Sequence, residues 1–197
     1  MMRELIDGPP LPVSYRPGIV NRMKSVYIET SVVSYLTARP SRDLLITACQ
    51  QATRDWWQLR RCRYELFTSQ LVATEAAAGD PEMSKKRIDH LKDIPELQIT
   101  AEVRDLAKTL VEHGAMPHKA EADALHVAVA AVHQVDLLLT WNCRHIDNPT
   151  TKPLVRSVCR DAGYSCPEIC TPIEILEGGT DEERDTCGCL EKQGRVC

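Results

Sequence analysis

Residues 121–142 constrain the fold most strongly, because they predict a buried helix that runs directly into a buried strand. Residues 121–133 are rich in alanine, which has the highest helix propensity and allows a helix to lie close to a sheet. Leu125, Val129 and Val132 recur three or four positions apart, as on the buried side of a helix. The apolar segment that follows predicts a short strand. A helix followed so closely by an apolar strand is typical of α/β proteins.

Strands and helices alternate along the rest of the chain, which predicts an α/β fold with a mainly parallel sheet. The predicted strands cover residues 26–29, 65–69 and 97–99, a segment ending at Asn142, and residues 168–170. The predicted helices cover residues 32–36, 42–60, a segment after Ser69 that includes Glu75, residues 81–91, 101–113, 121–133 and 152–162, and a short segment after Thr171. Several of these helices follow serine, threonine or aspartate, as expected of N-caps.

Changes in composition near the two ends predict one domain between two irregular segments. Residues 1–23 are rich in proline and glycine, and we interpret them as a flexible leader. Translation could start at Met1 or at Met23, which directly precedes the first predicted strand. Residues 24–177 form the predicted domain. Residues 178–197 are polar and charged, and we expect them to form a disordered tail.

The composition argues against two classes of protein. The formal net charge is −4, so the whole molecule is not a basic nucleic-acid binder, and any contact with RNA must use a local patch. No run of apolar residues approaches the roughly 18 needed to span a membrane. The N-terminus has no apolar segment of the kind found in signal peptides. We therefore expect a cytoplasmic protein that does not contact a membrane.

The chain contains nine cysteines, and we expect the six that lie within the predicted domain to be reduced in a protein without a signal peptide. Those expected to fill small core sites are Cys49, Cys62, Cys143, Cys159, Cys166 and Cys170. The remaining three, Cys187, Cys189 and Cys197, lie in the predicted tail, where they could bind a soft metal or form a disulfide.

Four polar residues map to the edge of the predicted sheet where parallel α/β proteins bind ligands, at the carboxyl ends of the strands. They are Glu29, Glu75, Asp123 and Asn142. Three carboxylates at one edge would repel one another unless a divalent cation lay among them. Hard oxygen ligands suit Mg²⁺ or Mn²⁺, which can lower the pKa of an attacking water. The hydroxyl groups expected to hold these carboxylates or waters in place are those of Thr30, Ser31 and Thr140.

Each of these residues also has a simpler interpretation. A glutamate after a strand is commonly a solvated loop residue, and Glu75 is also consistent with an acid on a helix surface. Asp123 lies in the first turn of its helix, where the helix dipole favours a carboxylate. His126 lies one turn after Asp123, and we interpret it as a packed core histidine more readily than as a catalytic base.

Five segments resemble, in the correct order, the characteristic segments of the PIN domain. Residues 26–33 resemble its opening strand, with an acid followed by Thr-Ser, and residues 69–75 resemble its second-acid helix. Residues 123–128 resemble the third-acid helix, residues 138–142 the fourth-acid segment, and residues 169–174 the closing strand. The resemblance covers about residues 24–177, and the chain is similar to VapC-type toxins of bacterial toxin–antitoxin pairs.

The resemblance implies a three-layer α/β/α fold with a five-stranded sheet of order 3-2-1-4-5. It also implies a metal-dependent endoribonuclease that hydrolyses RNA phosphodiester bonds with a metal-activated water. Glu29, Glu75, Asp123 and Asn142 would then be the catalytic and metal-binding residues, with Mg²⁺ or Mn²⁺ as cofactor. VapC-type toxins further imply a homodimer and a small VapB-type antitoxin that blocks the site.

Two positions depart from the family pattern. The usual first acid is aspartate, whereas Glu29 carries one more methylene group in a site where Mg²⁺ demands near-ideal geometry. The fourth acid is replaced by Asn142, which adds no charge, and Asp147 lies beyond the predicted strand end. The alternative function is therefore a PIN fold that binds RNA or a protein without cutting. A small-molecule phosphatase would require a nucleophilic aspartate where this chain has Glu29.

Arginines near two of the predicted strands are candidates for contact with RNA phosphates. They are Arg60, Arg61 and Arg63 before the second strand and Arg144 after the fourth. The first three also lie at the end of a long helix, where cations are favoured by the helix dipole. A solvated helix end is therefore their simpler interpretation.

Overall fold

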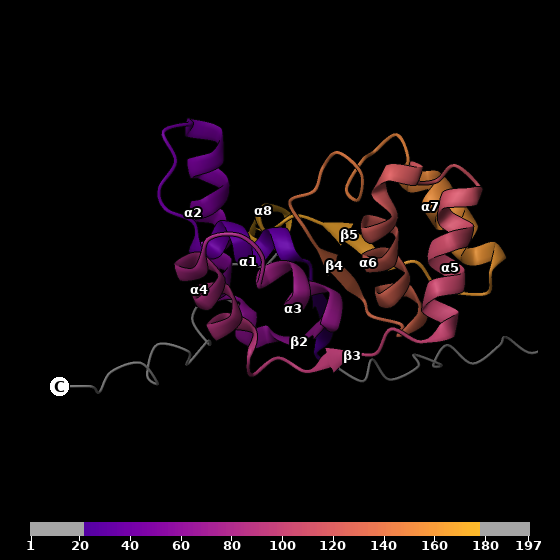
Figure 1. Ribbon diagram of the computed structural model, residues 1–197, viewed down its shortest axis with the longest axis horizontal. Coiled ribbons are helices and arrows are strands. Elements are labelled where there is room, and N and C mark those ends of the chain that lie inside the picture. Colours follow the sequence, from indigo (N-terminus) through magenta and orange to yellow (C-terminus); the bar gives the residue numbers. More distant parts are fainter. Residues whose placement is uncertain (1–21, 178–197) are drawn as a thin grey trace, which may run out of the picture.

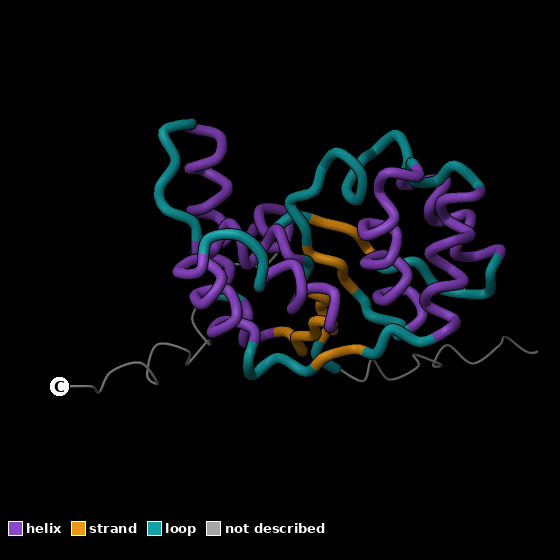
Figure 2. Tube along the Cα trace, in the orientation of Figure 1, coloured by secondary structure: helices purple, strands orange, loops and turns teal. Residues whose placement is uncertain are grey.

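The computed structural model describes residues 22–177, in which five strands form one parallel sheet of order β3-β2-β1-β4-β5 (Figures 1 and 2). The strands are β1 (Lys24–Ile28), β2 (Tyr64–Ser69), β3 (Glu96–Leu97), β4 (Leu137–Leu139) and β5 (Glu168–Cys170). Both the predicted α/β class and the predicted strand order are confirmed. Residues 1–21 and 178–197, which hold most of the predicted leader and the whole tail with Cys187, Cys189 and Cys197, lie outside the described residues.

The helices form two layers, one on each side of the sheet (Figure 1). The first layer contains α1 (Thr30–Thr37), α2 (Leu44–Leu59), α3 (Gln70–Ala76) and α4 (Pro81–Leu91). The second contains α5 (Ala101–Glu112), α6 (Glu121–Val132) and α7 (Lys152–Asp161). The chain adds strands outward from β1 to β3, returns to β4 and continues outward to β5. Because crossovers between parallel strands are right-handed, this reversal of direction places the later helices on the opposite face.

Short elements complete the chain between and after these layers. Two 3₁₀ turns, η1 (Arg61–Arg63) and η2 (His118–Ala120), precede β2 and α6. The last helix, α8 (Pro172–Glu177), packs against α2. Its start is the predicted capping box, because the backbone N–H of Thr171 donates to the Glu174 carboxylate at 2.7 Å.

Several boundaries differ from the prediction, and two of these differences coincide with hydrogen bonds to side chains. Helix α1 begins at Thr30, two residues early, since Glu29 itself acts as its N-cap. Strand β4 ends at Leu139 rather than Asn142. The N–H of Thr140 still donates to the backbone of Cys170, but those of Trp141 and Asn142 donate to the hydroxyl groups of Ser31 and Thr140, at 2.8 and 2.9 Å. Strand β3 contains only two residues, and its predicted extension is irregular.

Helix α6 is buried on most of its surface, as its alanine content predicts. Ala124, Ala128, Ala130 and Ala131 all have no exposed area. Small side chains let the helix backbone approach the strands closely, so this helix fixes the spacing of the second layer. The first layer instead packs large residues, with Trp56 among the fully buried side chains.

The cysteines only partly follow the prediction. Cys159 and Cys170 are buried free thiols, as expected of core residues. Cys49 and Cys166 are free and partly buried, whereas Cys143 is free but exposed, so it fills no core site. Cys62 was expected to be reduced, and this prediction is wrong because Cys62 is disulfide-bonded.

None of the helices within residues 22–177 combines the length and the hydropathy that crossing a lipid bilayer requires.

A single carboxylate joins the start of β1 to the chain before β4. Asp136 accepts hydrogen bonds from the backbone N–H and the hydroxyl of Ser25, both at 2.8 Å, and forms an ion pair with Arg22 at 2.7 Å. Burial raises the pKa of Asp136, but the two Ser25 donors and the Arg22 charge outweigh it, so the pKa lies below 3.8. A carboxyl group with a depressed pKa stabilises the folded state above its unfolded pKa, and this stabilisation is lost as the pH falls through the folded value.

We expect Asp136→Asn to lower the free energy of unfolding at neutral pH by about 1–2 kcal/mol, because an amide accepts more weakly and cannot pair with Arg22. The difference from the wild type should shrink in acid, because the unfolded chain takes up a proton first and the native carboxyl loses its charge as the pH falls through its depressed pKa. Urea unfolding across pH measures this, with Asp93→Asn at an exposed position as control. A difference that stays constant into acid would contradict the assignment.

Candidate functional site

Glu29 lies at the carboxyl end of β1, where it is only 5% exposed. One carboxylate oxygen accepts the backbone N–H of Ser31 at 3.1 Å. The other accepts the hydroxyl groups of Ser31 and Thr140, the latter at 2.7 Å. These donors belong to α1 and to the end of β4, so the carboxylate is fixed between the two central strands of the sheet.

Glu75 reaches the same edge from α3, the helix that follows the neighbouring strand β2. One of its oxygens accepts the hydroxyl of Thr30 and lies 3.1 Å from Nε2 of His126. Its side chain is 32% exposed, so this carboxylate is accessible to solvent. Burial raises the pKa of Glu75, but the hydrogen bond and charge of His126, together with the Thr30 hydroxyl, outweigh it and hold the pKa below its ordinary value.

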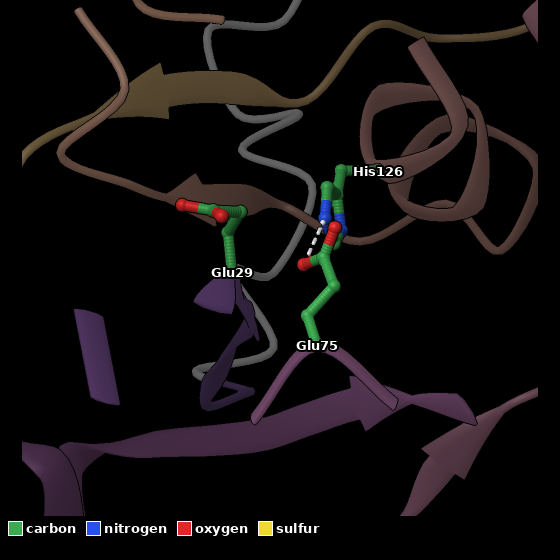
Figure 3. Close-up of side chains that lie close together, drawn as sticks. All are labelled: Glu29, Glu75 and His126. Carbon is green, nitrogen blue, oxygen red and sulfur yellow. Dashed lines mark hydrogen bonds and ion pairs between the residues drawn. The ribbon is translucent and has the colours of Figure 1, made fainter. Parts of the chain in front are cut away.

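His126 approaches the two glutamates from α6, on the opposite layer of helices (Figure 3). Its side chain is 1% exposed, and its Nδ1 lies 2.9 Å from the hydroxyl oxygen of Tyr27. The ligand atoms of Glu29, Glu75 and His126 all lie within 4.8 Å of one another. Among the described residues, no other group of three or more His, Cys, Asp or Glu side chains meets this criterion.

Sequence reasoning undervalued His126. The prediction of a buried histidine is confirmed, but this histidine also faces two carboxylates. The available signal was its position three residues after Asp123, since residues three apart lie on the same side of a helix. The neighbouring apolar residues concealed that signal, because they predict burial without showing what the buried side chain contacts.

Asp123 lies outside this group and belongs to a second cluster at the same edge. One of its oxygens accepts the amide N–H of Asn142 at 2.9 Å, and the other lies 2.8 Å from Nδ1 of His145. The two clusters are connected, because the backbone N–H of Asn142 donates to the hydroxyl of Thr140, which in turn donates to Glu29. Asp123 is therefore coupled to the glutamates through a hydrogen-bonded chain.

Asn142 uses both ends of its amide inside this second cluster. Its nitrogen donates to Asp123, and its oxygen accepts the backbone N–H of His145 at 3.1 Å. This arrangement assigns it to positioning Asp123 rather than to direct contact beside Glu29 and Glu75. Asp147, the other candidate for the fourth acid, pairs with Lys152 at 2.6 Å.

The candidate RNA-binding arginines fall at two different edges of the sheet. Arg61 and Arg63 precede Tyr64, which is in register with Lys24 at the start of β1. The length of β1, about 13 Å, therefore separates these arginines from the edge that carries Glu29. Arg60 is mostly buried, and the guanidinium of Arg61 lies 5.0 Å from the ring centroid of Trp57. Arg144, which is exposed, is adjacent in sequence to the Asn142 cluster.

The chemistry of the first cluster fits a divalent cation. It offers two carboxylates and one imidazole nitrogen from three separate elements, with hydroxyl groups orienting both carboxylates. Such hydrogen-bonded carboxylates and imidazoles are typical of protein metal ligands. Glu29, Glu75 and His126 are therefore the residues that could hold a metal ion.

The sequence matches no protein-family model, and comparisons with curated proteins and with solved structures likewise give no match. Membership of the PIN family therefore stays a prediction that depends on the five resembling segments.

We expect Thr140→Val to destabilise the fold by about 2 kcal/mol, because it removes a donor to the buried Glu29 carboxylate and an acceptor for the Asn142 N–H. Valine has nearly the same shape as threonine, so packing should change little. Thr140→Ser, which keeps the hydroxyl, is the matched control and should unfold at nearly the wild-type urea concentration. Equal stability of the Val and Ser variants would show that the hydroxyl does not hold Glu29.

Proposed function

We propose that this protein is a metal-dependent endoribonuclease of the PIN and VapC type, which hydrolyses RNA phosphodiester bonds. The observation that carries the proposal is the meeting of Glu29, Glu75 and His126 at the carboxyl edge of the sheet, within 4.8 Å. Ligands bind at this edge in open α/β sheets. The strand order, which equals the order implied by the resemblance, supports the same proposal.

The residues of the site have different proposed roles: some would bind the metal ion and others would position its ligands. A bound divalent cation would polarise a phosphodiester oxygen and lower the pKa of an attacking water. The partly exposed Glu75 leaves one side of the cluster open to a ligand, whereas the buried Glu29 is held rigidly by Ser31 and Thr140. Asp123 supplies a further fixed negative charge, and the exposed Arg144 is the arginine best placed for a phosphate contact.

The choice of RNA and the biological partners depend on the resemblance alone. We expect RNA as substrate, a VapB-type antitoxin that blocks the site, and a homodimer. We also expect a cytoplasmic location.

Purified protein should cut a mixed RNA pool into discrete products with Mg²⁺ or Mn²⁺, and EDTA should abolish the cutting. Glu75→Gln keeps the size of the side chain but removes the ligand charge, so cleavage should fall by about a hundredfold or more. Asp123→Ala should also lose most activity. Product length on sequencing gels measures these effects.

Glu65→Gln is the matched control, because Glu65 is an exposed glutamate near the start of β2, away from the carboxyl edge. It should cut as the wild type does. Cleavage that persists in EDTA, or that survives Glu75→Gln at the wild-type rate, would point to a contaminating nuclease and reject the proposed site.

A second candidate function is an RNA- or protein-binding module without cleavage. It is favoured by the second cluster, where Asp123 and Asn142 already satisfy one another and His145. Filter binding of labelled RNA in the presence of Mg²⁺ separates the two functions: retention without products supports the module. If Glu29→Asp then gives metal-dependent products, the longer glutamate is the reason that the natural site does not cut.

A further inference from the structure

We propose that His126 is a direct metal ligand, so that the site is a two-glutamate, one-histidine centre that selects a first-row transition-metal dication over Mg²⁺. This inference rests on the proposed function for the role of the metal. It goes further because the sequence and the resemblance offer only carboxylate and amide ligands, which do not distinguish Mg²⁺ from Mn²⁺.

His126 lies close enough to both glutamates to share a metal ion with them. Its Nε2 lies 3.1 Å from an oxygen of Glu75, inside the 4.8 Å group that includes Glu29. The ring is 1% exposed, so water cannot easily replace these neighbours. Glu75, by contrast, keeps an accessible side through which an ion can enter.

The other ring nitrogen of His126, Nδ1, contacts a buried tyrosine hydroxyl. Nδ1 of His126 lies 2.9 Å from the Tyr27 hydroxyl, which lies 2.7 Å from the Ser69 hydroxyl. A hydroxyl both donates and accepts, so Tyr27 can accept the Nδ1 proton while donating its own to Ser69.

The hydrogen bond between Nδ1 and Tyr27 orients the ring of His126 so that Nε2 is the atom available to bind a cation. Without a metal ion, the 3.1 Å contact between Nε2 and the Glu75 oxygen is a hydrogen bond in which the ring donates. A bound cation would displace that proton and take the lone pair of Nε2, while Nδ1 keeps its proton toward Tyr27. Metal-bound histidines in proteins commonly have their second nitrogen held by such a hydrogen bond. The buried Ser69–Tyr27–His126 chain therefore serves as the orienting support of a metal ligand.

The ligand set determines which metals fit. Mg²⁺ prefers an all-oxygen octahedral shell with several waters. Imidazole nitrogen adds affinity for transition-metal ions, which increases along the series that begins with Mn²⁺. The centre should therefore bind even Mn²⁺, the weakest of that series, more tightly than Mg²⁺.

The test measures Mn²⁺ binding to the full chain after removal of metals with a chelator. We expect Mn²⁺ to bind at least about tenfold more tightly than Mg²⁺ by competition, followed by electron paramagnetic resonance. Electron spin-echo modulation of the bound Mn²⁺ should show a directly coordinated imidazole nitrogen. His126→Gln should lose that nitrogen signal and weaken Mn²⁺ binding by about 10- to 100-fold.

His145→Gln is the matched control, because His145 is the other histidine near this edge and contacts Asp123 instead. The nitrogen signal should persist in it unchanged. Since His126 is fully buried, Tyr27→Phe provides a second test that keeps the imidazole: the signal should remain, and Mn²⁺ affinity should fall by about tenfold because the ring is less well oriented.

Bound Mn²⁺ without a nitrogen signal in the wild type would overturn this inference and leave the proposed ribonuclease intact. A nitrogen signal that persists in folded His126→Gln, or disappears in His145→Gln, would also overturn it. Nitrogen-coordinated Mn²⁺ in a protein that cuts no RNA would support the ligand and reject the proposed activity. Absence of any bound divalent ion in the folded wild type would reject both.

Discussion

The buried carboxylate of Glu29 is the constraint on which the central part of the structure depends. A carboxylate that is almost fully removed from water requires donors, since an unpaired buried charge costs several kcal/mol. Those donors come from Ser31 in α1 and Thr140 after β4, and the same two hydroxyls accept the N–H groups of the residues that follow β4. One charge thus joins two strands, a helix start and a loop.

Much of the fold could be predicted from the sequence because its signals are local. The alternation of strands and helices, the capping box at Thr171 and the alanine-rich α6 each depend on residues a few positions apart. One boundary that the prediction missed lies where a tertiary hydrogen bond competes with the local pattern. Strand β4 ends early because the Trp141 N–H finds a hydroxyl on α1, which no local pattern can show.

The site was predictable in part, for a similar reason. Glu29 follows the end of β1 and Glu75 lies in the helix that follows β2, and the order of a parallel sheet brings such positions together. The sequence favours a core role for His126 over a catalytic one, because a helix pattern shows burial but not the contact across layers. Asp123 and Asn142 lie near the glutamates, yet they bond to each other and to His145, and sequence cannot show which of several neighbouring polar groups will pair.

The tight packing of α6 against the sheet limits how far the site can adapt to a ligand. A helix whose alanines are fully enclosed cannot slide or tilt without opening voids in the core. The side chains that it presents to the carboxyl edge are therefore preorganised before any ligand arrives. Little conformational entropy remains to be lost there on binding, so the adaptation to different ligands must come from the exposed loops around this rigid centre.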